Sequence, residues 1–343
     1  MLRNQLLAGL GAIAFAGTAA VFGAATVRAQ QVPLVRALTE GWPQTVKVEG
    51  IELLPVRKDT YALIGGGANV TIQFGDEGVV IVDSGARGKA ASLLAAIRQL
   101  TPRPIRYLIN TNGDADHVAG NGEIVKAAGG IAGPSPAGGG GQAAQNLGIR
   151  TIAHENAVKE MIAGTKELAA LTGDAVPDST FFTPRKDIFA NGQGIELLAQ
   201  PASHTDGDLF VYFRRSDVVS AGDIYGTESY PRIEVSRGGS INGELDALNT
   251  LLEITIPERN QMGGTLVVPG HGRVSNEADV LEYRDMLTII RDRVQEMLKK
   301  GMTLQQVKAA RPALEYDPLY GTDKTWTGEM FLEAVYRDLG QKK

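Results

Sequence analysis

A buried strand that runs straight into a polar, glycine-containing loop constrains this chain more than any other stretch. Residues 105–109, IRYLI, have the apolar pattern of a strand inside a sheet, and residues 110–121, NTNGDADHVAGN, form a polar loop ahead of a helix. Inside that loop Asp116 and His117 stand side by side, a carboxylate and an imidazole at the edge of a rigid sheet. Two such groups do not complete a metal site, so further ligands are expected from other segments.

The choice of ligands is narrow because the chain of 343 residues contains no cysteine. A disulfide, a thiolate nucleophile and a sulfur ligand for zinc are therefore excluded. A metal ion must be held by His, Asp, Glu, Asn or water. The whole sequence has four histidines, which are His117, His154, His204 and His271.

The first 29 residues have the pattern of an export signal. Arg3 is followed by an Ala- and Gly-rich apolar run, and the triplet Val27-Arg28-Ala29 ahead of Gln30 is typical of a cleavage site. We expect cleavage after Ala29 and a periplasmic or secreted protein without stable membrane association. The alternative is a retained membrane anchor, since the apolar run is about long enough to cross a bilayer.

The net charge of −5 and the lack of basic runs argue against nucleic acid as a partner. The expected partner is a small-molecule substrate. The oligomeric state has no readable signal in the sequence.

Strand-rich segments alternate twice with strand–helix segments, which predicts two sheets packed face to face with helices on their outer faces. The first half gives an extended leader at 30–45, three short strands within 45–74, a strand at 78–82, a helix at 89–100, the strand at 105–109 and a strand and helix at 150–161. The second half gives the strand segments IELLAQPASH, DLFVYFRR and DVVSAGD, a helix at 244–256 and the strand GGTLVVPGHG.

Two connections and three C-terminal helices complete the expected layout. Residues 133–147 are rich in Gly and Pro and are expected to form a surface loop, and residues 164–183 a long irregular connection. Ser275 or Asn276 is suited to cap a long helix that ends near 299–301, followed by helices at 302–310 and 330–339. We expect one domain over 46–275, with the helices of 276–343 packed on it.

Three further segments share the character of the opening one, because each places a ligand-type residue near glycine at the end of an expected strand. They are PASHTDGD with His204, VVSAGDIYG with Asp223 and LVVPGHG with His271. A neighbouring glycine lets the backbone approach an ion or substrate without a Cβ in the way. Taken singly, each residue is more simply explained as a turn or capping residue. Together they indicate one shared site.

With this set assembled, the sequence resembles the metallo-β-lactamase superfamily of zinc hydrolases. The segments that carry the resemblance are, in order, IVDSG, NTNGDADHVAGN, ASHTDGD, AGDIYG and VPGHG. The resemblance implies an α+β fold, a four-layer αβ/βα sandwich in which two mixed β-sheets are flanked by helices. It also implies an active site at one edge of the two sheets, where a metal-activated water attacks an ester, lactone, amide or related bond.

The loop departs from the family pattern His-x-His-x-Asp-His, whose four positions are Asn112, Asp114, Asp116 and His117 here. The family's first zinc site would consist of Asn112, Asp114 and His204. An amide is a poor zinc ligand, and one carboxylate with one imidazole gives too few ligands to hold zinc firmly. The resemblance therefore implies a weak or empty first site.

The family's second zinc site would use Asp116, His117 and His271, with Asp223 as the bridging carboxylate, and all four residues are present. Three or four protein ligands plus water are the makeup of a catalytic zinc site. One zinc ion is expected, with two ions or no functional metal as alternatives. Manganese or iron is also compatible with a carboxylate-rich site.

Roles for the polar residues of the loop follow from these substitutions. Asp114 and Asp116 are the expected catalytic residues: Asp114 as a general base or to orient the attacking water, and Asp116 as a ligand of the ion that activates it. Asn112 or His204 is expected to stabilise the developing oxyanion.

For other residues near the expected metal ligands, the sequence indicates a role less specifically. Asp83 is expected beneath the site, hydrogen-bonded to a ligand or the loop, with a plain turn role as the alternative. His154 is expected to be a packed structural residue, with substrate contact as the alternative. Tyr225, Tyr230 and the loop at 236–239 are candidates for lining the pocket.

Two other functions are compatible with the sequence. A β-lactamase fits export, but the missing cysteine and the replacement at Asp114 argue against it. A non-catalytic binding protein with a degraded metal site fits the loss of two loop histidines, whereas the four retained ligands argue against it. Lactonase, arylsulfatase and hydrolytic dehalogenase activities each need only metal hydroxide and a shaped pocket, so the substrate stays open.

Overall fold

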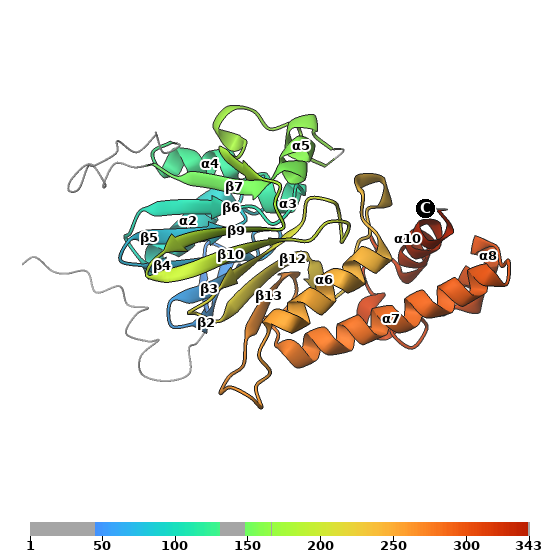
Figure 1. The fold of residues 1–343 in the computed structure, drawn as a ribbon. Helices are drawn as coiled ribbons and strands as arrows, with labels where there is room; N and C mark the ends of the chain where they lie inside the picture. The colour runs from blue at the N-terminus through green and yellow to red at the C-terminus, as the bar shows by residue number, and fades with distance from the viewer. Residues whose placement is uncertain (1–44, 131–147, 166, 342–343) are drawn as a thin grey trace, which may run out of the picture.

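The computed structural model describes residues 45–130, 148–165 and 167–341, and Figure 1 shows their fold. The expected export signal at 1–29, the leader up to residue 44 and the expected loop at 133–147 lie outside the described residues.

The first sheet consists of strands in strict chain order. They are β1 (Val46–Val48), β2 (Ile51–Arg57), β3 (Thr60–Ile64), β4 (Val70–Gly75), β5 (Gly78–Val82), β6 (Ile105–Ile109), β7 (Arg150–His154) and β8 (Ser179–Phe181). Strands β1 to β5 pair antiparallel, because short turns join them. Strands β5 to β8 pair parallel, with longer crossover connections between them. The sheet is therefore mixed, and the carboxyl ends of β5, β6 and β7 share one edge.

The second sheet repeats this plan in the order β13-β12-β11-β10-β9. Its strands are β9 (Arg185–Ala190), β10 (Gln193–Ala199), β11 (Leu209–Phe213), β12 (Val218–Gly226) and β13 (Leu266–His271). Strands β9 to β12 are antiparallel, and β13 lies parallel to β12 after the crossover through α6 (Ile241–Ile254).

Helices cover the outer face of each sheet. Helices α2 (Ala90–Leu100) and α4 (Asn121–Ala127) share one apolar core with the strands of the first sheet. Helices α6 and α7 (Glu277–Lys299) do the same for the second sheet, and Figure 1 shows them side by side. Between the sheets lies a third core that includes Val80, Ile109, Leu197 and Val211. The expected α+β four-layer sandwich with two mixed sheets is confirmed.

The C-terminal helices share the core of the second sheet. Helices α8 (Leu304–Ala310), α9 (Asp317–Tyr320) and α10 (Gly328–Gly340) follow α7. The ring of Phe331 in α10 stacks on that of Tyr230 with centroids 4.6 Å apart. Asn276 caps α7 in a capping box with Asp279. None of the helices described between residues 45 and 341 has the length and apolar character needed to cross a membrane.

Several expected boundaries were wrong. Helix α6 begins at Ile241 rather than at residue 244, because the Ser240 side chain accepts a hydrogen bond from the Gly243 backbone and so starts the helix earlier. The connection expected to be irregular contains the 3₁₀ turn η2 (Gly173–Ala175) and β8. Strand β9 was not expected, because its exposed Phe189 breaks the usual apolar pattern of a half-buried strand.

Candidate metal centre

The loop after β6 ends in a single helical turn that carries two ligand-type residues. This turn, α3 (Ala115–Val118), starts after Asp114, whose backbone is extended and whose N–H donates to the Asn112 side-chain oxygen at 2.9 Å. The turn places Asp116 and His117 above the carboxyl ends of β5 and β6. The loop expected from the sequence is therefore partly helical, which fixes the two side chains relative to each other.

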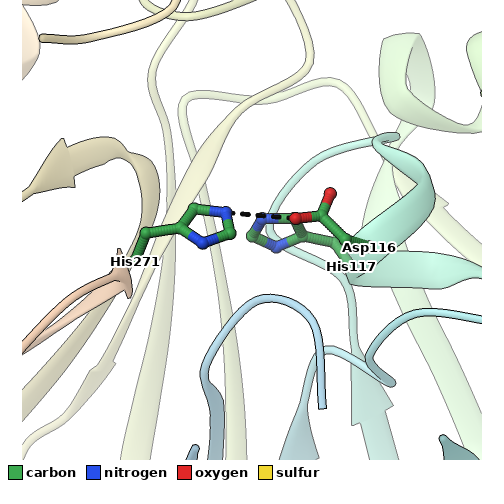
Figure 2. Close-up of side chains that lie close together, drawn as sticks. All are labelled: Asp116, His117 and His271. Atoms are coloured by element: carbon green, nitrogen blue, oxygen red, sulfur yellow. Dashed lines mark ion pairs between the residues drawn. The ribbon is translucent and has the colours of Figure 1, made fainter. Parts of the chain in front are cut away.

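Asp116, His117 and His271 form a group whose ligand atoms all lie within 4.8 Å of one another. His271 is the last residue of β13, so the second sheet brings it to the loop of the first sheet. Its Nε2 lies 3.1 Å from Asp116 Oδ2, the ion pair drawn as a dashed line in Figure 2.

Asp223 completes this group from within β12. Its Oδ1 lies 3.1 Å from His117 Nε2 and 3.5 Å from His271 Nε2. Both His117 Nε2 and Asp223 Oδ1 are buried, and neither makes a hydrogen bond within the described part of the chain. Two buried lone-pair atoms that face the same space without an aligned hydrogen bond fit a set of metal ligands, because a shared cation would satisfy both.

Glycine makes the close approach of Asp223 possible. A Cβ on Gly270 would lie 2.3 Å from Asp223 Oδ1, closer than any real contact. Asp223 lies inside β12, which continues to Gly226, and not at a strand end as expected. The β12–β13 pairing shifts register between Gly222 and Gly226, and this irregularity surrounds the ligand position.

Asp83 holds the imidazole of His117 in place. Its carboxylate accepts hydrogen bonds from Thr111 N at 2.8 Å and Thr111 Oγ1 at 2.7 Å, and lies 2.8 Å from His117 Nδ1. Asp83 is 1% exposed and has a φ of +66°, a strained conformation held by these contacts. A carboxylate on Nδ1 fixes the ring so that Nε2 is free to bind a metal.

A second group is formed by Asp114, His204 and Asp223, again with ligand atoms within 4.8 Å of one another. His204 Nε2 lies 3.1 Å from Asp114 Oδ2 and 3.9 Å from Asp223 Oδ2. His204 Nδ1 contacts the backbone oxygen of Arg232. Strand β10 ends at Ala199, so His204 lies in the turn beyond it and not at the strand end as expected.

Asn112 and Arg237 present donors to this second group. The Asn112 side-chain nitrogen donates to Asp223 Oδ2 at 3.3 Å, because its oxygen is engaged by the Asp114 backbone. Arg237 Nη2 forms an ion pair with Asp114 Oδ1 at 2.6 Å. Arg237 ends the 3₁₀ turn η3 (Val235–Arg237). Sequence reasoning placed this arginine in a possible pocket loop but missed its contact with Asp114, for which a single sequence holds no signal.

Electrostatics couple these groups. Burial lowers the pKa of His117, but the carboxylates of Asp223 and Asp83 outweigh it and raise the pKa well above 6.5. Neighbouring carboxylates likewise overcome burial and raise the pKa of His204. Burial would raise the pKa of Asp223, yet His117, His271 and His204 bring it well below 3.8. Protons and a metal ion would compete for the same atoms, so metal affinity falls as the pH falls.

Asp114 contacts His204 through Oδ2 and forms an ion pair with Arg237 at Oδ1, which accepts no hydrogen bond within the described residues. Burial acts to raise its pKa, but His204 and Arg237 oppose it, so the pKa lies below its usual value of 3.8. A carboxylate in this state accepts a proton weakly. The geometry therefore supports an orienting role for Asp114 more directly than the general-base role.

A cavity of about 850 Å³ opens next to both groups. Its lining includes Tyr225, Tyr230 and Arg237, which the sequence indicated as candidates. It also includes Tyr283 from α7 and Asp323 from the segment between α9 and α10, which the sequence did not indicate. The C-terminal helices thus shape the space in front of the candidate ligands.

His154 lies outside this cavity lining and has structural contacts. Its side chain accepts a hydrogen bond from Asn156 N at 3.4 Å and so caps α5 (Glu155–Ala163). Its ring meets Phe181 edge-on with centroids 5.5 Å apart. Burial lowers the pKa of His154. These contacts agree with the structural reading of this residue.

Comparison with solved structures shows the fold. A stereoselective inverting sec-alkylsulfatase from Pseudomonas sp. is 18% identical, with a TM-score of 0.58, over 83% of this chain and 49% of that one. The chain thus spans about half the length of that protein. The DIM-1 metallo-beta-lactamase is 14% identical, with a TM-score of 0.52, over 71% of this chain and 99% of that one.

A family model identifies the group to which the chain belongs. The model of the metallo-beta-lactamase superfamily matches residues 63–287, which contain every ligand of both groups described above. A search of curated proteins gave no match. Because the match covers more than half of the chain, this protein belongs to the metallo-beta-lactamase superfamily.

Proposed function

We propose that this protein is a hydrolase that works with one divalent ion, zinc, held by Asp116, His117, Asp223 and His271. The supporting observation is the convergence of four ligand atoms from three distant segments, two of them buried and without hydrogen bonds in the described part. Imidazole nitrogens with carboxylate oxygens suit zinc, and also manganese or iron. When bound, such an ion activates water and polarises the scissile bond.

The residues around the ligands hold the ligand side chains in position. Asp83 fixes the His117 ring. The Asn112 side-chain nitrogen donates to Asp223 Oδ2 at 3.3 Å, and the same N–H group is the proposed donor to a developing oxyanion. Asp114 orients His204 through their ion pair at 3.1 Å.

The role of Asp114 is separable by experiment. If Asp114 only orients His204, the Asp114→Asn substitution should lower kcat/KM. It should not move the acidic limb of the pH profile of kcat/KM. If Asp114 is instead the general base, its replacement by Asn should remove the acidic limb from the pH profile, and that result would overturn the orienting role.

Metal content and hydrolysis together test the proposal. Purified protein is expected to hold about one zinc per chain and to hydrolyse at least one member of a panel of chromogenic esters, lactones, sulfates and a cephalosporin. Asp116→Ala should lose both properties, whereas Asp174→Ala, at an exposed acid in η2, should keep both. Protein that holds no metal would support the binding-protein alternative instead.

The lining of the cavity favours substrates without negative charge. Besides the candidate ligands, the lining carries Glu167, Glu228, Glu234 and Asp323. Its two arginines are already in ion pairs, one with Asp323 and the other with Asp114 and Glu160. A net acidic cleft lowers the local concentration of anions.

We therefore propose neutral esters or lactones as substrates, ahead of sulfate esters and cephalosporins. The test compares kcat/KM for a neutral ester and its carboxylate-bearing analogue across ionic strength. The neutral ester should be preferred at low salt, with the preference shrinking as salt screens the cleft. Preference for the anionic analogue would contradict this substrate class.

We further propose export to the periplasm or beyond, on the strength of residues 1–29. Mature protein beginning at Gln30 in a periplasmic or secreted fraction is the expected result, and a full-length membrane-bound chain would support the anchor instead.

A further inference from the structure

Arg237 reaches the second ligand group from a rigid position. Its Nε and Nη2 donate to the Glu160 carboxylate at 2.9 and 2.6 Å, a bidentate pair. Its backbone oxygen accepts from Asp206 N at 3.0 Å. The Arg237 and Glu160 side chains are only 20% and 15% exposed, so this pair is more than a surface contact.

The loop that carries Asp114 is built to receive this pair. A Cβ on Gly113 would lie 2.8 Å from Glu160 Oε2 and 3.1 Å from the Ala157 backbone oxygen, so glycine leaves room for α5 and the Glu160 carboxylate beside the loop. The same approach brings the guanidinium to 2.6 Å from Asp114 Oδ1. Glycine, glutamate and arginine thus come from three segments to one contact.

The guanidinium and the Asn112 amide together surround the acceptors of the second group. Asp114, His204 and Asp223 offer ligand atoms, while Arg237 and Asn112 offer N–H donors that cannot bind a cation. The Arg237 guanidinium lies 2.6 Å from Asp114 Oδ1, an oxygen that accepts no hydrogen bond within the described part of the chain, and its fixed positive charge opposes the entry of a divalent ion there.

We propose that Arg237 takes the place of a second metal ion, neutralising Asp114 so that this chain works with a single metal. The inference rests on the proposed function, since it assumes an ion at Asp116, His117, Asp223 and His271. Arg237 is a positioning residue in this view, because it acts through Asp114.

The experiment measures zinc stoichiometry and affinity by calorimetry and native mass spectrometry, independently of activity. Wild-type protein should hold one zinc, and Arg237→Gln should take up a second, its Kd falling by about tenfold or more, the scale of a close charge pair. Arg214→Gln is the matched control, because Arg214 also pairs with a glutamate, Glu196, but lies in the turn between β11 and β12 and contacts none of the candidate ligands in the ion pairs of the described residues. It should stay at one zinc.

The outcomes separate the role of Arg237 from the one-metal function. A folded Arg237→Gln that stays at one zinc overturns the role of Arg237 and leaves the one-metal hydrolase intact. Wild-type protein that holds no zinc overturns the one-metal function, and wild-type protein that holds two overturns both that function and the role of Arg237. If Arg237→Gln does not fold, the double variant Arg237→Gln/Glu160→Gln carries the test, since it removes both charges and leaves no unpaired carboxylate at Glu160. That variant should also take up a second zinc, and one zinc would again overturn the role.

Discussion

At the scale of single residues, the site depends on how His117 is oriented. Its Nδ1 faces Asp83 at 2.8 Å, and its Nε2 faces Asp223 at 3.1 Å, so one ring links a supporting carboxylate to a candidate ligand. Such supporting carboxylates raise the basicity of the imidazole and fix its tautomer. Asp83 therefore matters for metal affinity without touching the ion.

Replacing Asp83 by Asn tests this support. Asn tolerates the left-handed backbone at this position, so the fold should persist. The loss of the carboxylate should weaken zinc binding by about 10- to 100-fold in a chelator competition assay. Asp76→Asn, at an exposed surface acid, is the control and should bind like the parent. An unchanged Kd for Asp83→Asn would show that Asp83 has only a turn role.

The sequence could indicate the ligands but not the arginine beside them. Asp116 and His117 follow a buried strand, and His271 ends one, so their positions follow from strand periodicity. The partners of Arg237 lie in α5 and in the loop after β6, far away in the chain. Only the folded arrangement of three segments brings these charges together.

At the scale of elements, α6 carries an unusual buried acid. Glu244 is 0% exposed, and neither of its carboxylate oxygens has a hydrogen-bond partner in the described part of the chain. Burial, with a further contribution from Asp208, raises its pKa well above 4.5. The ionised form is thus disfavoured in the folded state, which costs stability once the unfolded chain would ionise.

Glu244→Gln should therefore stabilise the protein in a pH-dependent manner. Below about pH 4.5 the carboxyl is protonated in both states and the variant gains little. As the pH rises towards the raised folded-state pKa, the gain in unfolding free energy should grow, by about 1.4 kcal/mol per unit of pKa difference. Urea unfolding from pH 4 to 8, with a chelator present, measures the difference in unfolding free energy between the variant and the parent. Glu253→Gln, at an exposed residue of the same helix, is the control. A gain that is constant with pH would contradict the buried-acid explanation.

Helix α7, which has capping residues and a regular apolar face, was predicted well from the sequence. Strand β9, which depends on pairing with β10, was not. Helix α7 has a capping box at Asn276 and a regular apolar face, so its start and end were confirmed. Strand β9 exists because it pairs antiparallel with β10, and its own burial pattern is weak. A strand whose stability comes from a neighbour leaves little trace in its own residues.

At the scale of the whole molecule, the C-terminal helices support the wall of the cavity. The family match ends at residue 287, yet Phe331 of α10 stacks on Tyr230, which lines the cavity. Tyr283 of α7 packs edge-on against Tyr225, another lining residue. The segment beyond the family match is thus continuous with the core that shapes the cavity.

Removing the Phe331 ring should destabilise the whole fold. Phe331→Ala creates a cavity in the core of the second sheet and should cost about 3–5 kcal/mol of unfolding free energy. Denaturant unfolding measures this, with the half-exposed neighbour Met330→Ala expected within about 0.5 kcal/mol of the parent. A loss below about 1 kcal/mol for Phe331→Ala would show that α10 is not part of this core.

The two sheets bring the turn after β6, the interior of β12 and the last residue of β13 towards one proposed metal position. Anomalous diffraction at the zinc edge, from crystals grown with zinc, tests this most directly. We expect one strong peak among Asp116, His117, Asp223 and His271. Absence of a peak there, or a peak of equal strength among Asp114, His204 and Asp223, would contradict it.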